Sequence, residues 1–261
     1  MTMMSEVILD RLDDGRISTV ALNRPAKRNA LSPLLSMAFR ERLDQAAGDS
    51  SHLVLVRSAV PGTFCSGFDI GFIGTEQHQA GEEAMLGCFA AIERMRKVTV
   101  CLADGFVFGG GVELFLAADI RLATPNATFR ITPALLGVVY PYRGLSRFVS
   151  VMGITAAMEL VMTARRIDAQ EAMRIGLVTR VVPDEVAGID YCRQVAALAP
   201  LSQQAMKAVL KLAADKIAPL QATEEEWRMI LEAAARADAS EDQREGRRAF
   251  AEKRPPRFQG Q

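Results

Sequence analysis

The chain has 261 residues, of which 49% are hydrophobic and 24% charged, as is ordinary for a globular protein. Its 31 acidic and 31 basic residues leave no net charge, which argues against attraction to nucleic acid or an anionic membrane by bulk charge. This length allows one large core, or one core with a small satellite domain.

Several classes of site lack the residues that they need. The two histidines, His52 and His78, have no metal-binding companion at a useful spacing, so we predict no metal and no Ser-His-Asp hydrolase. The four cysteines lie far apart, as expected of buried reduced thiols. The N-terminus is unlike a signal or transit peptide, and no apolar stretch reaches the ~18 residues of a membrane span. We therefore predict a cytoplasmic protein without a membrane or nucleic-acid partner.

The first part of the chain alternates predicted strands and helices. Strands at 7–12 and 17–22 flank Asp13-Asp14-Gly15-Arg16, a hairpin signal. Ser32 before Pro33 is typical of a helix N-terminus, and that helix runs to about residue 47. Apolar patterning then predicts strands at 53–58 and 98–103 and an amphipathic helix at 81–96.

A glycine corner follows the strand at 98–103. The run Phe108-Gly109-Gly110-Gly111-Val112-Glu113 leads into an apolar segment that reads as a buried helix. Glycines let the backbone approach a ligand, and the free N–H groups of a first helical turn point toward it. A carboxylate one turn inside the helix adds an acid or base. This combination suits a reaction that makes an oxyanion and moves a proton, which indicates enolate chemistry on an activated acyl group.

After the glycine corner the pattern continues and then changes. Strands are predicted at 119–123 and 177–182, with helices at 144–164 and from the Asp168 cap to Gly176. Residues 186–252 read as almost continuous helix, broken at Pro200 and near Pro219. The alternation predicts an α/β core with crossover connections over residues 1–190, followed by a helical region over 191–261.

Several segments together carry a family resemblance along nearly the whole chain. The chain resembles the crotonase (enoyl-CoA hydratase/isomerase) superfamily in the order of its motifs, including the glycine corner with Glu113. The other matching segments are Val20-Ala21-Leu22-Asn23-Arg24-Pro25, Asn29-Ala30-Leu31-Ser32, Phe64-Cys65-Ser66-Gly67-Phe68-Asp69-Ile70, Leu136-Gly137, Ile167-Asp168-Ala169-Gln170-Glu171-Ala172 with Gly176-Leu177-Val178, and the tail from Ser240 to Arg254.

The resemblance implies a fold, an assembly and a substrate class. The fold would be a spiral core of repeated ββα units, and the C-terminal helices would form a trimerisation region, giving a homotrimer or a dimer of trimers. The substrate would be a coenzyme A thioester, with no other cofactor. The backbone N–H groups of Phe68 and Gly110 would form the oxyanion hole.

The resemblance also assigns the coenzyme A site. It places Lys27, Arg28 and Ala30 near the adenine and ribose phosphate, with Ser66 and Ile70 lining the same cleft. Lys253 would reach the nucleotide from the C-terminal region, which would thus help to complete the site.

One departure from the family pattern concerns the acid–base residues. Glu113 matches the first of two glutamates that hydratases of this family use, but Pro133 stands where the second is expected. Proline can neither give nor take a proton, so hydration or isomerisation would depend on Glu113 alone.

A second departure favours another reaction. Thr132-Pro133, Leu136-Gly137-Val138 and Tyr140 resemble the methylmalonyl-CoA decarboxylase branch, in which Tyr140, together with Arg143, would position a departing carboxylate. That branch carries His where this chain has Phe68, so the match is incomplete. We predict an enoyl-CoA hydratase/isomerase family enzyme of fatty acid metabolism. The alternatives are decarboxylation of a methylmalonyl-CoA-type thioester and a non-catalytic acyl-CoA-binding or RNA-binding role.

Overall fold

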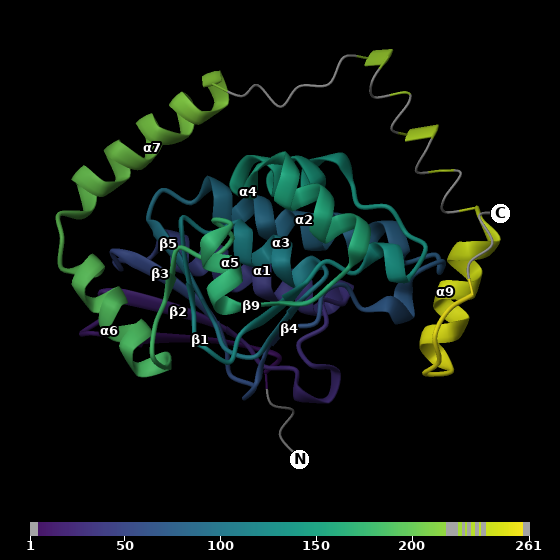
Figure 1. Ribbon diagram of the computed structural model, residues 1–261. Coiled ribbons are helices and arrows are strands. Elements are labelled where there is room, and N and C mark those ends of the chain that lie inside the picture. Colours follow the sequence, from purple (N-terminus) through teal and green to yellow (C-terminus); the bar gives the residue numbers. More distant parts are fainter. Residues whose placement is uncertain are drawn as a thin grey trace.

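The computed structural model describes residues 5–217 and 239–257, together with 224–225, 228, 231–232 and 235. Two sheets form the centre of the protein (Figure 1). The larger is six-stranded, with the order β1-β2-β3-β5-β7-β10. Its strands are β1 (Val7–Leu12), β2 (Ile17–Leu22), β3 (Leu53–Ser58), β5 (Val98–Ala103), β7 (Ile120–Ala123) and β10 (Arg180–Val181). Apart from the β1–β2 hairpin, neighbouring strands in this sheet run parallel.

The smaller sheet was not predicted from the sequence. It has four strands in the order β4-β6-β8-β9. These are β4 (Thr63–Cys65), β6 (Phe106–Phe108), β8 (Thr128–Arg130) and β9 (Ile167–Asp168). Strands of two or three residues are too short to show the two-residue periodicity that identifies a strand.

The two sheets arise from a repeated unit. Each unit places one strand in the large sheet and the next in the small sheet, and then adds a helix. The units are β3-β4 with α2 (His78–Arg94), β5-β6 with α3 (Gly110–Leu116), and β7-β8 with α4 (Tyr142–Thr163). The predicted spiral of ββα units is thereby confirmed. Helix α2 begins one turn earlier than the predicted residue 81.

Both faces of the large sheet are covered at its inner strands β3 and β5, whose residues are almost all buried. In β3, Leu53 and Leu55 pack toward α6 (Glu185–Ala196), whereas Val54 and Val56 belong to the main core under the other helices. The main core also takes the buried face of α1 (Pro33–Gly48), which Ser32 caps through its side chain as predicted. Successive side chains of such a strand point to opposite faces of the sheet. Because both faces are buried, the strand carries few polar residues.

Helix α4 corrects the expectation that the chain has no segment long and apolar enough to cross a membrane. In the described part of the chain, α4 alone meets that criterion by length and composition. Its apolar residues serve two faces: Phe148 and Met152 are buried in the main core, while Ile154 and Met158 are exposed. Gly153 has a non-helical backbone (φ 75°, ψ 160°), which interrupts the helix between these two groups.

The C-terminal part differs in detail from the prediction. The strand expected at 177–182 is shorter than predicted: it is reduced to β10, and the amides of Thr179 and Val182 on either side of it also donate to β7. The helix at the Asp168 cap is confirmed as α5 (Ala169–Arg174). The break at Pro200 separates α6 from α7 (Pro200–Ile217), and the break expected near Pro219 lies outside the described residues. The boundary predicted after residue 190 lies inside α6, so the division into two domains stays a prediction.

The remaining elements are short helices and the C-terminal helix. These are η1 (Pro25–Lys27), η2 (Ile70–Phe72), η3 (Pro133–Leu135) and α9 (Glu241–Ala251). Helix α7 lies at one side of the molecule and α9 at the other (Figure 1). Helix α9 packs closely on the loop after η3, because a Cβ built on Gly137 would lie 2.7 Å from the backbone nitrogen of Gln243.

Candidate active site

Two backbone segments meet at the predicted oxyanion site. The segment that follows β4 passes the N-terminus of α3 so closely that a Cβ built on Gly67 would lie 2.8 Å from the amide nitrogen of Gly110. Gly67 also has a φ of +94°, a region that side chains disfavour. A residue larger than glycine therefore does not fit at position 67. At this glycine the segment after β4 meets the start of α3, although the two are far apart in the sequence.

The amides of Phe68 and Gly110 lie next to each other in this contact. A Cβ built on Gly110 would lie 3.5 Å from the Phe68 nitrogen. Leu31 pairs with the amide and carbonyl groups on either side of Phe68, and no bond from the Phe68 N–H reaches another described residue. Gly110 is the first residue of α3, so no carbonyl lies one turn before it to accept its N–H.

The Phe68 side chain is directed away from its amide, toward helix α2. Its ring lies 5.7 Å from the His78 ring, centroid to centroid, and a Cβ built on Gly81 would lie 3.3 Å from it. The packing of the Phe68 ring is therefore compatible with the assignment of its backbone N–H as an amide donor. Packing holds the side chain, and this leaves the backbone N–H available.

Glu113 is fully buried one turn into α3. Its Oε2 accepts a hydrogen bond of 3.2 Å from Arg147 on α4, whereas Oε1 has no partner among the described residues. Helix α4 approaches so closely that a Cβ built on Gly144 would overlap Oε2 and would lie 3.0 Å from Oε1. The carboxylate therefore packs against α4 at Gly144, with Oε2 bonded to Arg147 and Oε1 left without a hydrogen-bond partner.

Burial governs the protonation of Glu113. Loss of hydration raises the pKa of its carboxyl to about 7, because the charged form is disfavoured away from water. The Arg147 guanidinium opposes this effect, and the negative charges of Glu82 and Glu93 on α2 add to it. The carboxyl therefore changes its protonation near neutral pH, which is the range in which a general acid or base works best.

Sequence reasoning missed Arg147 and its partner Glu93. The Arg147 side chain is 8% exposed, and its Nε and one terminal nitrogen donate to Glu93 Oε1 at 2.8 and 2.6 Å. Arg143, which was proposed to position a substrate carboxylate, is instead exposed and pairs with Glu93 Oε2 at 3.2 Å. The sequence does contain a sign of this pair: Arg147 lies inside the apolar stretch 144–152, and an arginine in such a stretch needs a buried partner.

Tyr140 is placed beside the glycine corner. A Cβ built on Gly109 would lie 3.6 Å from the Tyr140 hydroxyl and 2.9 Å from the Thr132 hydroxyl. The Tyr140 hydroxyl is buried without a hydrogen-bond partner among the described residues, and burial together with Glu113 raises its pKa well above the ordinary value. Pro133 begins η3 and is buried, so no carboxylate arises from that position.

Most residues assigned to coenzyme A lie on two adjacent segments. Ser66 donates its backbone N–H to the carbonyl of Arg28 at 3.1 Å, and its hydroxyl lies 3.3 Å from the carbonyl of Lys27. Ala30 is buried next to them, and Ile70 begins η2 on the same segment as Ser66. The side chains of Lys27 and Arg28 are exposed, as contact with a phosphate requires.

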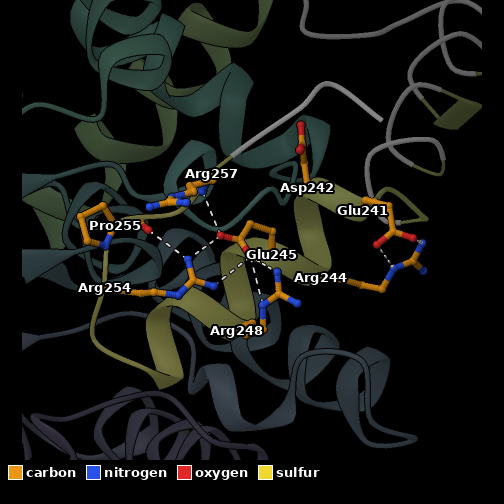
Figure 2. A pocket seen from close by; sticks show the side chains of 8 residues that line it. All are labelled: Glu241, Asp242, Arg244, Glu245, Arg248, Arg254, Pro255 and Arg257. Atoms are coloured by element: carbon orange, nitrogen blue, oxygen red, sulfur yellow. Dashed lines mark hydrogen bonds and ion pairs between the residues drawn. The ribbon is translucent and has the colours of Figure 1, made fainter.

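Lys253 lies on a third segment, directly after α9. A cavity of about 640 Å³ is lined there by Glu241, Asp242, Arg244, Glu245, Arg248, Arg254, Pro255 and Arg257 (Figure 2). Glu245 accepts from Arg248, from Arg254 at 2.6 Å and from the backbone of Arg257 at 2.9 Å, which holds its pKa well below the usual range. The charged residues that line this cavity are therefore largely paired with one another.

The cysteines and Asp69 have structural surroundings. The four cysteines are free and buried, and burial raises the pKa of the Cys65 thiol to about 12. Asp69 accepts from Arg24 at 2.8 Å and caps η2, which is a structural role. Within the described ranges, no group of three or more His, Cys, Asp or Glu is arranged to hold a metal ion.

Comparisons with known proteins identify the family to which the chain belongs. The enoyl-CoA hydratase/isomerase family model matches residues 13–261. The chain is 32% identical to 2,3-dehydroadipyl-CoA hydratase of Escherichia coli (strain K12), over 98% of this chain and 100% of that protein. It is 28% identical to mitochondrial methylglutaconyl-CoA hydratase of Mus musculus, over 94% of this chain and 80% of that protein.

Solved structures match over the whole chain. Methylmalonyl-CoA decarboxylase complexed with 2S-carboxypropyl-CoA matches with a TM-score of 0.90 at 25% identity, over 99% of each chain. Carnitinyl-CoA hydratase from Mycobacterium avium matches with a TM-score of 0.78 at 29% identity, over 98% of this chain and 99% of that chain. The chain belongs to the enoyl-CoA hydratase/isomerase family and is an enzyme that acts on acyl-CoA thioesters.

Proposed function

We propose that this protein converts an enoyl-CoA through a thioester enolate, with Glu113 as the group that transfers the proton. The observation that carries this proposal is the buried Glu113 carboxylate, which has one unpartnered oxygen and lies one turn into the helix that begins at Gly110. A buried polar atom without a partner costs free energy, so a site that keeps one is well explained by a ligand that supplies the partner.

In this proposal the thioester oxygen lies between the N–H groups of Phe68 and Gly110. For hydration, Glu113 takes a proton from water as the water oxygen bonds to the β-carbon. The two amides then stabilise the enolate oxygen, and Glu113 returns the proton to the α-carbon. One oxyanion-hole donor typically contributes about 10²–10³-fold in kcat. This reaction uses no cofactor beyond the coenzyme A of the substrate.

A second candidate function is decarboxylation of a methylmalonyl-CoA-type thioester. It is favoured by the unpartnered Tyr140 hydroxyl and by Pro133, which leaves Glu113 without a second carboxylate. The structural likeness to methylmalonyl-CoA decarboxylase also supports it. Here the carboxylate leaves as carbon dioxide and the same amides stabilise the enolate, so no base is required to form it.

Substrate assays with a matched variant separate these functions. Purified protein and its Glu113→Gln variant are offered crotonyl-CoA and, separately, methylmalonyl-CoA. Loss of crotonyl-CoA absorbance that falls by about 10²–10⁴-fold in the variant would support the proposal, since general acid–base catalysis contributes that much. Carbon dioxide release that survives the substitution would instead support decarboxylation. Thioester binding without either reaction would leave a binding protein.

For coenzyme A we propose contacts from Lys27, Arg28, Ala30, Ser66 and Ile70, with Lys253 from the end of α9. The support is the pairing of the first two segments and the exposure of their basic side chains. Since the chain has no net charge, phosphate binding depends on such a local group.

We also propose that the chain assembles as a homotrimer or a dimer of trimers in the cytosol. The support is the exposure of large apolar side chains on α4 and α7, which is unusual for a monomer. They are Ile154, Met158, Met162, Leu201, Met206, Val209, Leu210 and Leu212. Light scattering on the purified protein tests the proposal, and a monomer at micromolar concentration would contradict it.

A further inference from the structure

We infer that Arg147 is a positioning residue for Glu113: it holds Oε2 from one side and so presents Oε1 to the substrate. The inference rests on the proposed function, because it assigns the atom of Glu113 that transfers the proton. It goes beyond that function by naming the residues that fix this atom, Arg147 and Glu93.

The first step is the geometry of the guanidinium. One terminal nitrogen of Arg147 donates to Glu113 Oε2 at 3.2 Å, while Nε and the other terminal nitrogen both donate to Glu93 Oε1. A guanidinium is a rigid planar fork, so fixing two of its nitrogens fixes the direction of the third. Glu93 therefore sets where Arg147 points, and Arg147 sets where Glu113 Oε2 lies.

The second step is the packing around these groups. The guanidinium carbon lies 5.8 Å from the centre of the buried Phe89 ring, and the Arg147 side chain is only 8% exposed. Gly144, one turn earlier on α4, leaves just enough space for the carboxylate. Both oxygens lie against α4 at Gly144, but Oε2 already accepts from Arg147, so the unpartnered Oε1 is the oxygen that remains for a ligand.

Among the described residues, titratable groups from α2, from α4 and from the loop before α4 face Glu113. Arg147 approaches from α4 and lowers the pKa of the Glu113 carboxyl, whereas Glu82 and Glu93 approach from α2 and raise it. Tyr140, from the loop before α4, stays neutral, because its own pKa is raised. Arg147 and Glu93 thus act on Glu113 in opposite directions, which gives a test that mere structural support would not pass.

The experiment follows the protonation of Glu113 directly. Infrared titration of the full-length protein records its carboxylic C=O stretch, which is assigned by its loss in Glu113→Gln. In Arg147→Gln we expect the midpoint to rise by about 1 to 3 pH units, as loss of an adjacent opposite charge does. In Glu93→Gln we expect it to fall. Arg143→Gln is the matched control, because Arg143 contacts Glu93 but not Glu113.

Turnover supplies the second readout. The kcat/KM of Arg147→Gln at pH 7 should fall about 10²-fold, the size of effect expected from a misplaced catalytic group. Arg147→Lys keeps the charge but not the fork, so it should restore the midpoint more fully than kcat/KM. If Arg147→Gln matches Arg143→Gln in both readouts, the inference is wrong.

Two further outcomes are decisive. If Arg147→Gln does not fold, Glu93→Gln decides alone, and an unchanged midpoint in that variant overturns the inference. If the wild type turns over no thioester while Arg147→Gln still shifts the midpoint, the proposed function fails and the control of Glu113 by Arg147 stands.

Discussion

This protein buries charges in two different ways, at Lys97 and at Glu113. The Lys97 ammonium, at the start of the β5 region, has four acceptors: the carbonyls of Ala46 and Asp49, the Asp49 carboxylate and the Ser51 hydroxyl, at 2.7 to 3.1 Å. Glu113 has a single donor at 3.2 Å and an unpartnered second oxygen. Both groups are almost completely buried.

The difference separates a structural charge from a functional one. Multiple short bonds hold the pKa of the Asp49 carboxyl well below its usual range, whereas the pKa of Glu113 rises to about 7. A satisfied buried pair ties α1 to the sheet, and its loss would affect folding. An unsatisfied carboxylate beside free amides lowers stability, and its loss should affect chemistry.

The largest expected effect on stability is at Lys97. Lys97→Met leaves the Asp49 carboxylate without its buried partner, so the free energy of unfolding should fall by about 3–5 kcal/mol. Chemical denaturation measures this change. Arg193→Met is the control, because the exposed Arg193–Asp190 pair should contribute about 0.5 kcal/mol or less. If Lys97→Met has the stability of the wild type, or if it loses kcat without losing stability, Lys97 is not the structural charge that distinguishes it from Glu113.

The next effect is on catalysis, at the glycine contact. Gly67→Ala would place a methyl group 2.8 Å from the Gly110 nitrogen and move one amide donor, so kcat should fall by about 10²–10³-fold. Gly48→Ala is the matched control, since no atom lies within 4 Å of a Cβ built there. Steady-state kinetics on the thioester that the wild type converts provide the measurement. Equal kcat values for the two variants would mean that the contact only packs the fold.

A smaller effect of opposite sign is expected at Tyr140. Removal of its unpartnered buried hydroxyl in Tyr140→Phe should raise the free energy of unfolding by about 1 kcal/mol, because that hydroxyl lost its water on folding. If Tyr140 positions a substrate carboxylate, decarboxylation falls in the same variant. Tyr191→Phe, in which the ring lies under Arg180, serves as the control. A destabilised Tyr140→Phe would show that the hydroxyl is satisfied in solution.

The smallest effect is expected at the exposed basic residues. Lys27→Ala should raise KM by up to about 5-fold with kcat unchanged, because an exposed charge pair contributes at most about 1 kcal/mol. Added salt should reduce the difference between variant and wild type. Arg193→Ala on α6, which pairs with Asp190 away from this segment, should leave KM unaltered. A change in kcat rather than KM would place Lys27 in the reacting part of the site.

The sequence alone predicted the larger elements well. Strands of six residues such as β3 and β5 and the capped helix α1 carry periodicity and cap residues that act locally. The four-stranded small sheet was missed, because its strands are held by pairing with distant segments rather than by their own pattern. The strand expected over 177–182 is too long for the converse reason: its apolar residues Leu177 and Val178 pack in the core without pairing with a strand.

The candidate site was predictable where the backbone makes it and obscure where side chains from distant helices meet. Gly110 and Glu113 are neighbours in sequence, so the glycine corner was visible at once. Arg147 and Glu93 are 54 residues apart, and only the fold brings them together behind Glu113. Without knowledge of that contact, Arg143 was the more obvious arginine, although it is largely exposed.

The most direct test of the central claim compares unfolding of the wild type and Glu113→Gln as a function of pH. The pKa of Glu113 rises from an ordinary 4.5 to about 7 on folding, so between these values the folded state holds a proton that the unfolded state has released. The stability of the wild type should therefore fall by about 3 kcal/mol relative to the variant as the pH rises from 4.5 to 8. A difference that does not depend on pH would mean that Glu113 is satisfied in the fold, as Asp49 is, and would contradict its role as the proton-transferring group.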